Sequence, residues 1–300
     1  MSKLLPMAHP ADATPPPFGR IAIIGFGLIG ASLALAVRRL WPSVLLIAVD
    51  RRDVIETAMR MHAADVGGDD PVLAAEADLV VLAAPVLANI SLLARLADDI
   101  PGDAVVTDVG STKRDIVIAA RTLPPRLQFV GGHPLAGAAT GGLQAARDDL
   151  FQGRPWILTP ASDAAQAAAT RLTVLIDAVG ARVRMMAPEA HDLLVAYLSH
   201  LPQLAASALM HVVGEHVGAD GLALAGRGLR DTTRLASSPA DIWRDIAASN
   251  QDHIARAIDE LVAILLRMKP APNSPHEALD HTFDSAAEWK RVLERAAEPS

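Results

Sequence analysis

The feature that most constrains the fold of this chain is a glycine-rich turn between an apolar run and an uncharged helical stretch. Ile21–Ile24 has the composition of a buried strand, and Leu28–Arg39 has no polar face before its two terminal arginines. Between them, Gly25–Gly30 has the spacing G-x-G-x-x-G, which permits a tight turn, a close approach to a pyrophosphate and close helix–strand packing. A buried βα turn without a ligand is the alternative. The turn predicts dinucleotide binding at the helix N-terminus by Gly25, Gly27, Leu28, Ile29 and Gly30.

The residues that end the next predicted strands indicate which dinucleotide would bind. Asp50 ends the following strand about twenty residues after Gly30, where a carboxylate would hold the ribose hydroxyls and repel a 2′-phosphate. This favours NAD, although Arg51-Arg52 follows directly and could accept that phosphate, which leaves NADP as an alternative. Ala84-Pro85 follows another strand, and small residues there would let the nicotinamide nucleotide lie close.

The pattern of apolar runs changes between the two halves of the chain. From Pro188 on, long helical patterns replace the short apolar runs of the first half. We therefore expect an α/β fold with a disordered tail over residues 1–19, an N-terminal Rossmann-like, doubly wound, mostly parallel sheet over residues 20–187, and an all-α C-terminal dimerisation domain over residues 188–300. The predicted strands are Ile21–Ile24, Val44–Val49, Leu79–Ala83, Ala104–Val109, Phe129–Gly131 and Trp156–Leu158.

The helical half carries its own boundary signals. Ser238-Pro239 predicts a helix start, with a hydroxyl N-cap and proline at the first helical position. Pro270–Pro275 predicts a loop before a short closing helix. Because an Ala-rich helical domain often needs a partner's surface to complete its core, we expect a homodimer through the C-terminal helices. One apolar face is marked by Ile242, Ile246, Ile254, Ile258, Leu261 and Leu265.

Composition argues against several classes of function. The 300 residues carry a formal net charge of −7 and no cysteine. Without a run of Lys or Arg, nucleic-acid binding is not expected, and disulfides, thiolate nucleophiles and Cys-ligated metals are excluded. Ile21–Val37 is slightly short for a membrane span, and the proline-rich residues 1–20 lack the hydrophobic segment of a signal peptide. We expect a cytoplasmic protein without membrane contact.

Two polar segments follow predicted strands and would lie at the carboxyl edge of the sheet, where open parallel sheets bind ligands. His133 stands among the glycines of Gly131–Gly137, and a neutral imidazole there can accept a proton from a hydroxyl whose carbon loses hydride. A turn histidine bonded to the backbone is the equally weighted alternative. Ser111, in Asp108–Lys113, would N-cap the next helix and could also bond a substrate hydroxyl or orient His133.

The helical half offers polar side chains and a cation. His200 and Gln203 are three residues apart and share a helix face, beside Pro202, which we expect to kink the helix. His191 lies about half a turn away from that face on a straight helix, and no metal site is expected among these histidines. Arg234 could grip a carboxylate with two parallel hydrogen bonds, although the protein surface is the usual location of an arginine.

Together these segments resemble the prephenate/arogenate dehydrogenases of tyrosine biosynthesis, the TyrA family. The resemblance implies oxidative decarboxylation of a cyclohexadienol, with hydride passing to NAD(P)⁺ and the ring carboxylate leaving as CO₂. It further implies that His133 accepts a hydrogen bond from the substrate hydroxyl, that Ser111 assists it and that Arg234 binds the substrate carboxylate. Further substrate-binding positions are His200, Gln203 and Trp243. The segments that carry the resemblance are Gly25–Gly30, Asp108–Lys113, Gly131–Gly137, Gly153–Trp156, Ser199–Gln203, Asp231–Ala236, Ser238-Pro239 and Trp243–Ile246.

Two positions depart from the family's pattern. Ala138-Ala139 stands where many relatives carry Thr and Glu, and Gln203 stands where prephenate-preferring relatives often carry a second histidine. These departures favour arogenate or dual specificity over strict prephenate specificity.

Three alternatives stay open. An aminodeoxyprephenate dehydrogenase would perform the same chemistry on a ring amine. A β-hydroxyacid dehydrogenase would need a catalytic lysine in the first long helix of the second domain, where this chain has none. A non-catalytic dinucleotide sensor would have no use for His133 together with Arg234.

Overall fold

The computed structural model describes residues 15–138, 141–160, 163–270 and 277–297. The chain divides into two compact units. One contains the residues up to Val195 together with Ser237–Asn250, and the other contains Ala196–Ala236 and the residues from Gln251 on. The first unit therefore runs past the boundary expected after residue 187 and takes back a later segment of the chain.

The start of the first unit lies earlier than expected. Residues 1–14 of the predicted tail lie outside the described part of the chain. Phe18 is only 1% exposed, and the Arg171 guanidinium lies 4.3 Å from the centroid of its ring. Ordered structure therefore begins before residue 20.

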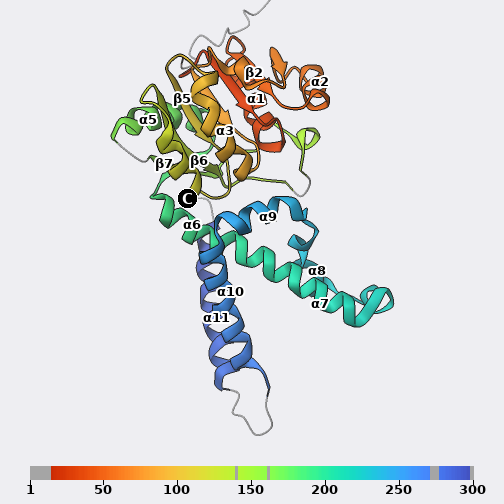
Figure 1. The fold of residues 1–300 in the computed structure, drawn as a ribbon. Helices are drawn as coiled ribbons and strands as arrows, with labels where there is room; N and C mark the ends of the chain where they lie inside the picture. Colours follow the sequence, from red (N-terminus) through yellow and green to blue (C-terminus); the bar gives the residue numbers. More distant parts are fainter. Residues whose placement is uncertain (1–14, 139–140, 161–162, 271–276, 298–300) are drawn as a thin grey trace, which may run out of the picture. The chain divides into compact units, whose positions relative to one another are not determined.

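A sheet of eight strands forms the centre of the first unit within the described residues, in the order β3-β2-β1-β4-β5-β6-β7-β8 (Figure 1). Strands β1 to β6 run parallel, β7 is antiparallel to β6, and β8 is parallel to β7. The strand order reverses between β1 and β4, which makes the carboxyl ends of these two strands the switch point of the sheet. The strands are β1 (Arg20–Ile24), β2 (Leu45–Val49), β3 (Val66–Gly68), β4 (Leu79–Leu82), β5 (Ala104–Asp108), β6 (Leu127–Pro134), β7 (Pro155–Pro160) and β8 (Arg182–Met185).

Helices cover both faces of this sheet, because successive strand residues point to opposite sides. Ile21 and Ile23 belong to one core, with α1 (Leu28–Leu40) and α5 (Asp163–Ala178). Ala22 and Ile24 belong to a second core, with α3 (Val86–Asp99) and α4 (Arg114–Ala119). Burial on both faces explains why the strands are continuously apolar. The other helical elements here are α2 (Arg52–Arg60), α6 (Pro188–Val195), α9 (Ala240–Ser249) and the short turns η1 (Pro71–Ala74), η2 (Ala120–Thr122) and η3 (Leu143–Ala145).

Two features of the sheet differ from the sequence prediction. The apolar pattern does not predict β3 or β8, because β3 contains two glycines and β8 alternates arginines with apolar residues at the sheet edge. β6 is longer than the predicted Phe129–Gly131, since its last residues pair with β7 after its parallel neighbour β5 has ended. His133 therefore lies within a strand and not in a loop that follows it.

The second unit is helical. Its elements are the π-helical turn η4 (Ala196–His200), α7 (Leu201–Ala223), α8 (Arg227–Thr232), the 3-10 turn η5 (Arg234–Ser237), α10 (Gln251–Met268) and α11 (Glu277–Ala297). Helices α10 and α11 contact each other and lie side by side in Figure 1. Pro202 lies in the first turn of α7, directly after the π-helical turn. The helix type thus changes just before the residue at which we expected a kink.

Two predicted helix boundaries need correction. Helix α9 begins at Ala240 with Pro239 at the N-cap position, one residue later than a Ser238 N-cap predicts. The closing helix α11 has 21 residues and is therefore not short. The loop predicted at Pro270–Pro275 falls almost entirely outside the described residues.

The predicted apolar face after Ser238-Pro239 is divided. Asn250 separates α9 from α10, so Ile246 and Ile254 are buried whereas Ile242 and Leu265 are exposed. One helical stretch among the described residues, Pro188–Ala223, has the length and composition to cross a membrane, with 28% of its apolar window buried. Most of that apolar window is therefore not buried in the described chain.

Candidate active site

The glycine-rich turn joins β1 to α1 at the switch point of the sheet. Gly25 has φ +96°, and a Cβ there would overlap the backbone at the end of β4. A Cβ on Gly30 would overlap the carbonyl oxygen of Gly25. Gly27 is the N-cap of α1, where a Cβ would meet nothing within 4 Å and where no described side chain caps the helix. Because Leu28-Ile29 then opens the helix, the positive end of α1 fits a dinucleotide pyrophosphate.

Asp50 is fixed beside this turn at the end of β2. Its Oδ2 accepts a hydrogen bond from the Phe26 N–H at 2.6 Å, and its Oδ1 accepts one from the Arg51 N–H at 2.7 Å. This places a carboxylate where ribose hydroxyls follow a bound pyrophosphate. The exposed guanidinium of Arg51 lies 3.6 Å from the Asp53 carboxylate, and a partnered arginine is a weaker site for a 2′-phosphate.

A buried amide holds the turn that follows β4. Asn89 Nδ2 donates to the carbonyl oxygens of Leu82 at 3.1 Å and Ala84 at 2.9 Å. Pro85 is the N-cap of α3. The two residues predicted to lie near the nicotinamide, Ala84 and Pro85, thus follow directly after β4, beside the glycine-rich turn. The sequence pattern did not single out Asn89, whose partners lie within one or two turns of it.

The loop between β5 and α4 holds a fully buried ion pair. Lys113 Nζ contacts Asp108 Oδ2, and both side chains are 0% exposed. Asp108 also accepts hydrogen bonds from the N–H groups of Gly110 at 2.8 Å and Gly132 at 3.0 Å. Burial lowers the pKa of Lys113, although the charge of Asp108 opposes this shift. The pair therefore pins the loop that carries Ser111 to strand β6.

Ser111 is half-buried and does not cap α4, because the N-cap position belongs to Lys113. The first N–H groups are satisfied instead by Asp192 of α6, whose Oδ1 accepts from Lys113 at 2.7 Å and Oδ2 from Arg114 at 2.9 Å. Asn250 Nδ2 in turn donates to the carbonyl oxygen of Asp192 at 2.8 Å. The local hydroxyl predicted as a cap is thus replaced by a carboxylate from a distant part of the chain.

His133 lies near the end of β6, beyond the last pairing of β6 with β5. Gly131 and Gly132 before it are buried, and a Cβ on Gly132 would overlap the carbonyl oxygen of Asp108. The glycines therefore let β6 pass close to the β5–α4 loop. His133 reaches the same carboxyl edge of the sheet as the glycine-rich turn.

His133 belongs to a chain of three side chains. Its Nδ1 lies 2.8 Å from Nε2 of His191, and Nδ1 of His191 lies 2.7 Å from Oδ1 of Asp192. The two rings meet edge to face, with centroids 5.1 Å apart. His191 and Asp192 are 0% exposed, whereas His133 is half-buried. His133 is therefore the accessible end of a buried polar chain, as a general base requires.

The carboxylate at the buried end is charged. Burial by itself would raise the pKa of Asp192, but hydrogen bonds from His191 and from the N–H groups of Arg114 and Lys113 hold that pKa below its ordinary value. Its Oδ2 also lies 3.4 Å from Nε of Arg114. At neutral pH Asp192 can therefore only accept hydrogen bonds.

The remaining predicted substrate residues lie in both units. Trp243 is half-buried in α9 of the first unit. In the second unit, His200 ends the π-helical turn and is buried, as is Gln203 in α7. Gln203 Nε2 donates to the carbonyl oxygen of Leu235 at 2.7 Å. This bond ties the turn that carries the exposed Arg234 to α7.

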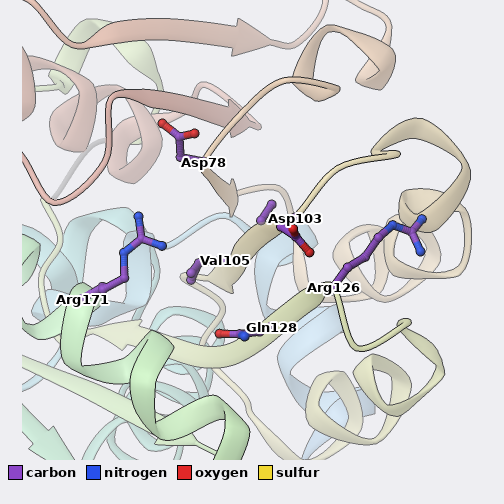
Figure 2. Close-up of a pocket in the computed structure, with 7 residues that line it drawn as sticks. Asp78, Asp103, Val105, Arg126, Gln128 and Arg171 are labelled. Atoms are coloured by element: carbon purple, nitrogen blue, oxygen red, sulfur yellow. The ribbon is translucent and has the colours of Figure 1, made fainter.

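A hollow lies at the amino ends of the strands, and none of its described lining residues is a histidine (Figure 2). Its volume is about 180 Å³, and its lining residues are Asp78, Asp103, Ala104, Val105, Arg126, Gln128 and Arg171. Asp78 accepts from the N–H groups of Gly19 and Arg20 at 3.0 and 2.9 Å, and Arg171 donates to the Pro17 carbonyl at 2.9 Å. Asp78 and Arg171 therefore fix the segment before β1. The hollow also lies away from the carboxyl ends of the strands, where open parallel sheets bind ligands.

The pattern of the sequence did not assign a role to His191, Asp192 or Asn250. Helical spacing separates His191 from His200, whereas the structure pairs His191 with a strand residue. The available signal was a His-Asp dipeptide at the start of an apolar helix. No group of three or more His, Asp or Glu side chains within the described ranges is arranged to hold a metal ion.

Comparison with protein families matches both halves of the chain. Residues 33–185 match the prephenate dehydrogenase nucleotide-binding domain, and residues 187–281 match the prephenate dehydrogenase dimerization domain. The first match begins after the glycine-rich turn, so the geometry of that turn is separate evidence for the cofactor.

Individual relatives agree with these matches. The chain is 37% identical over 280 residues to a prephenate dehydrogenase of Bacillus subtilis, covering 91% of this chain and 76% of the relative. It is 32% identical over 259 residues to a cyclohexadienyl dehydrogenase of Zymomonas mobilis, covering 85% and 88%. Prephenate dehydrogenase from A. aeolicus, solved with hydroxyphenyl propionate and NAD⁺, superposes with a TM-score of 0.80 at 28% identity, covering 92% of this chain and 96% of that one. Synechocystis arogenate dehydrogenase gives 0.71 at 29% identity with the same coverage.

Proposed function

The chain belongs to the prephenate dehydrogenase family and is an NAD-dependent oxidoreductase, and from this premise we propose that it catalyses oxidative decarboxylation of arogenate, prephenate or both in tyrosine biosynthesis. The products would be tyrosine from arogenate and 4-hydroxyphenylpyruvate from prephenate. Relatives of similar identity are named prephenate, cyclohexadienyl or arogenate dehydrogenase, so the family leaves the choice of substrate open.

In the proposed mechanism, His133 is a general base that accepts a proton and later returns it. Bound NAD⁺ would supply the acceptor for the hydride that leaves the ring carbon carrying the hydroxyl. His133 takes the hydroxyl proton at Nε2 as that carbon becomes a carbonyl. When the bond to the ring carboxylate breaks, CO₂ leaves and its bonding electron pair makes the ring aromatic, with negative charge on the oxygen. His133 returns the proton to that oxygen, so the base is regenerated.

The other residues bind and orient. Gly25–Gly30 and the N-terminus of α1 would hold the pyrophosphate of the cofactor, and Asp50 would hold its ribose. Ser111, on the loop pinned to β6, assists His133. Arg234 binds the substrate carboxylate, because a substrate with two carboxylates needs a local guanidinium in a protein of net charge −7. His200, Gln203 and Trp243 complete the proposed substrate-binding set.

The observation that carries the proposal is the position of His133. It lies at the same sheet edge as the glycine-rich turn and is held through Nδ1 by a buried histidine–aspartate pair. A non-catalytic dinucleotide sensor would need the turn but not a supported base. The family match also argues against a β-hydroxyacid dehydrogenase.

We propose arogenate or dual specificity, supported by Gln203 in place of a second histidine. Its buried amide already donates to Leu235 and so presents a neutral group near the Arg234 turn. Ala138, the other departure, is exposed, and Ala139 lies outside the described residues.

The protein is proposed to be a cytoplasmic homodimer. The dimerization-domain match covers residues 187–281, and the exposed apolar side chains of α11 include Trp289 and Leu293. A second copy, and not a bilayer, would cover such faces. Light scattering should therefore show a dimer, and the variant Trp289→Asp/Leu293→Asp should weaken it. A wild-type monomer, or partition into vesicles, would contradict this.

One assay tests the activity. The purified protein is mixed with NAD⁺ or NADP⁺ and with prephenate, arogenate, aminodeoxyprephenate or a β-hydroxyacid, while reduced nicotinamide is followed by absorbance. We expect reduction with arogenate or prephenate and faster reaction with NAD⁺. His133→Asn should lose turnover but keep NAD⁺ binding. Reduction only with a β-hydroxyacid, or with none of these compounds, would overturn the proposal.

A further inference from the structure

We propose that His191 and Asp192 are positioning residues that fix the ring tautomer of His133 and thereby make its Nε2 the proton acceptor. The catalytic consequence rests on the proposed function. The tautomer itself is a property of the protein without substrate or cofactor.

The tautomer follows from the order of donors and acceptors along the chain of side chains. Ionised Asp192 has no proton to give, so Nδ1 of His191 carries the hydrogen of the 2.7 Å contact. A neutral His191 then has its lone pair on Nε2. The 2.8 Å contact with His133 needs one hydrogen, which must come from Nδ1 of His133. Neutral His133 with Nδ1–H carries its lone pair on Nε2.

A neutral His191 is part of the proposal, and the burial of its ring supports this. The ring is 0% exposed, and a buried imidazolium would lose its hydration. Asp192 is the facing carboxylate, and its Oδ2 lies 3.4 Å from Nε of Arg114. The other charged groups here are Glu189, 3.5 Å from Arg114, and the buried pair of Lys113 with Asp108. A neutral His191 is therefore inferred from the burial of its ring.

The same hydrogen bond serves both protonation states of His133. After Nε2 takes a proton, Nδ1 still donates to His191, and the Asp192 carboxylate beyond it favours the positive charge. The geometry need not rearrange during the proton's transfer and return. With Nδ1 unprotonated instead, Nε2 would present a donor to the substrate hydroxyl and could not accept its proton.

The frame that holds this chain is rigid. Asp192 is fixed through two N–H groups of α4, and its carbonyl is held by Asn250 from the returning segment. Side chains of β6 and α6 are thereby locked to α4. Such a satisfied, buried polar network fixes a single arrangement.

The first test reads the tautomers directly. Protein labelled with ¹⁵N in the histidine rings, free of cofactor and substrate, is studied by long-range ¹⁵N–¹H correlation at neutral pH, with signals assigned from His133→Asn and His191→Gln. We expect Nδ1 protonated and Nε2 unprotonated in both rings. Protonated Nε2 with unprotonated Nδ1 in His133 would overturn the proposal. Because this needs no turnover, it stands apart from failure of the proposed function.

The second test separates positioning from packing. His191→Gln keeps an oxygen acceptor near the place of Nε2, whereas His191→Phe keeps a ring but no acceptor. Val195→Ala, one turn later in α6 and 2% exposed, is the matched control for lost packing.

We expect kcat to fall about a hundredfold in His191→Phe, within the range of general-base contributions, and less in His191→Gln. In the two His191 variants, KM for NAD⁺ should change less than about threefold. In Val195→Ala, kcat should also change less than about threefold. The acid limb of kcat/KM should move to lower pH in His191→Phe, because the His133 imidazolium loses its acceptor. A kcat within threefold of wild type, or an unmoved acid limb, would overturn the proposal. If wild type oxidises none of the substrates, the proposed function fails and the tautomer measurement alone decides.

Discussion

Removing the Lys113 amino group should destabilise the protein far more than removing a surface charge. Lys113 and Asp108 are both 0% exposed, so Lys113→Met leaves a buried carboxylate without its counter-ion. Breaking a buried pair from one side costs about 3–5 kcal/mol. The N–H groups of Gly110 and Gly132 still solvate Asp108, which places the expected loss near the lower end, about 3 kcal/mol.

A second substitution tests the reason for this loss. Lys113→Met/Asp108→Asn removes the orphaned charge while the amide oxygen can still accept from a backbone N–H. The double variant should therefore be more stable than Lys113→Met alone, by about 1 kcal/mol or more. Arg52→Met is the control, because Arg52 pairs with Glu56 on the surface at 3.1 Å and such pairs contribute about 0.5 kcal/mol at most.

Urea unfolding at one fixed protein concentration measures these free energies, since any dimer makes stability depend on concentration. The reasoning is refuted if Lys113→Met lies within about 1 kcal/mol of wild type. It is also refuted if the stability loss of Lys113→Met/Asp108→Asn equals the sum of the losses measured for Lys113→Met and Asp108→Asn alone.

Three further predictions concern the two binding sites and pH. Asp50→Ser removes the carboxylate oxygen 2.6 Å from the Phe26 N–H, so it should raise the Kd for NAD⁺ about tenfold and reduce the protein's preference for NAD⁺ over NADP⁺. An unchanged ratio of the Kd for NADP⁺ to the Kd for NAD⁺ in calorimetry would contradict this. Arg234→Gln should raise substrate KM by about 10- to 150-fold, equivalent to about 1.5–3 kcal/mol, with little change in kcat, and a KM within twofold of wild type would place the carboxylate elsewhere. Because the pKa of Asp192 in the folded protein lies below the ordinary value of 3.8, the stabilisation by its carboxylate is complete above pH 3.8 and is lost as the pH falls through the lower, folded-state pKa. The stability advantage of wild type over Asp192→Asn should therefore shrink in acid unfolding series, and a constant advantage would count against the charged carboxylate.

The parts of the fold that could be predicted are those that a short stretch of sequence determines. Burial on both faces makes β1, β2, β4 and β5 continuously apolar, and the glycine spacing in Gly25–Gly30 fixes the first βα turn. β3 and β8 escape prediction because strands toward the sheet's edges bury less and so carry weaker apolar patterns. Asn250 ends α9 within an otherwise regular apolar repeat, and tertiary contacts fix that break.

The candidate site was predicted in its accessible part and missed in its buried part. His133 stands out because glycines surround it, but its partner His191 is 58 residues away in the chain, so no local spacing connects them. Ser111 satisfies the rule for a local N-cap, yet Asp192, 78 residues from Arg114, provides two charge-assisted hydrogen bonds where a hydroxyl could provide one. Sequence rules rank local partners only, and here a distant carboxylate is the stronger one.

The return of Ser237–Asn250 to the first unit has a consequence for synthesis on the ribosome. Thr112 exchanges a hydrogen bond with Ser249 at 2.8 Å, and Asn250 clamps the backbone of α6. A nascent chain that has emerged only as far as residue 195 therefore has the whole sheet but not the last clasp on the histidine–aspartate pair. The sheet can form early during translation, whereas the candidate site reaches its final geometry only after residue 250 has left the exit tunnel. Maturation of the proposed base therefore requires synthesis of most of the helical half.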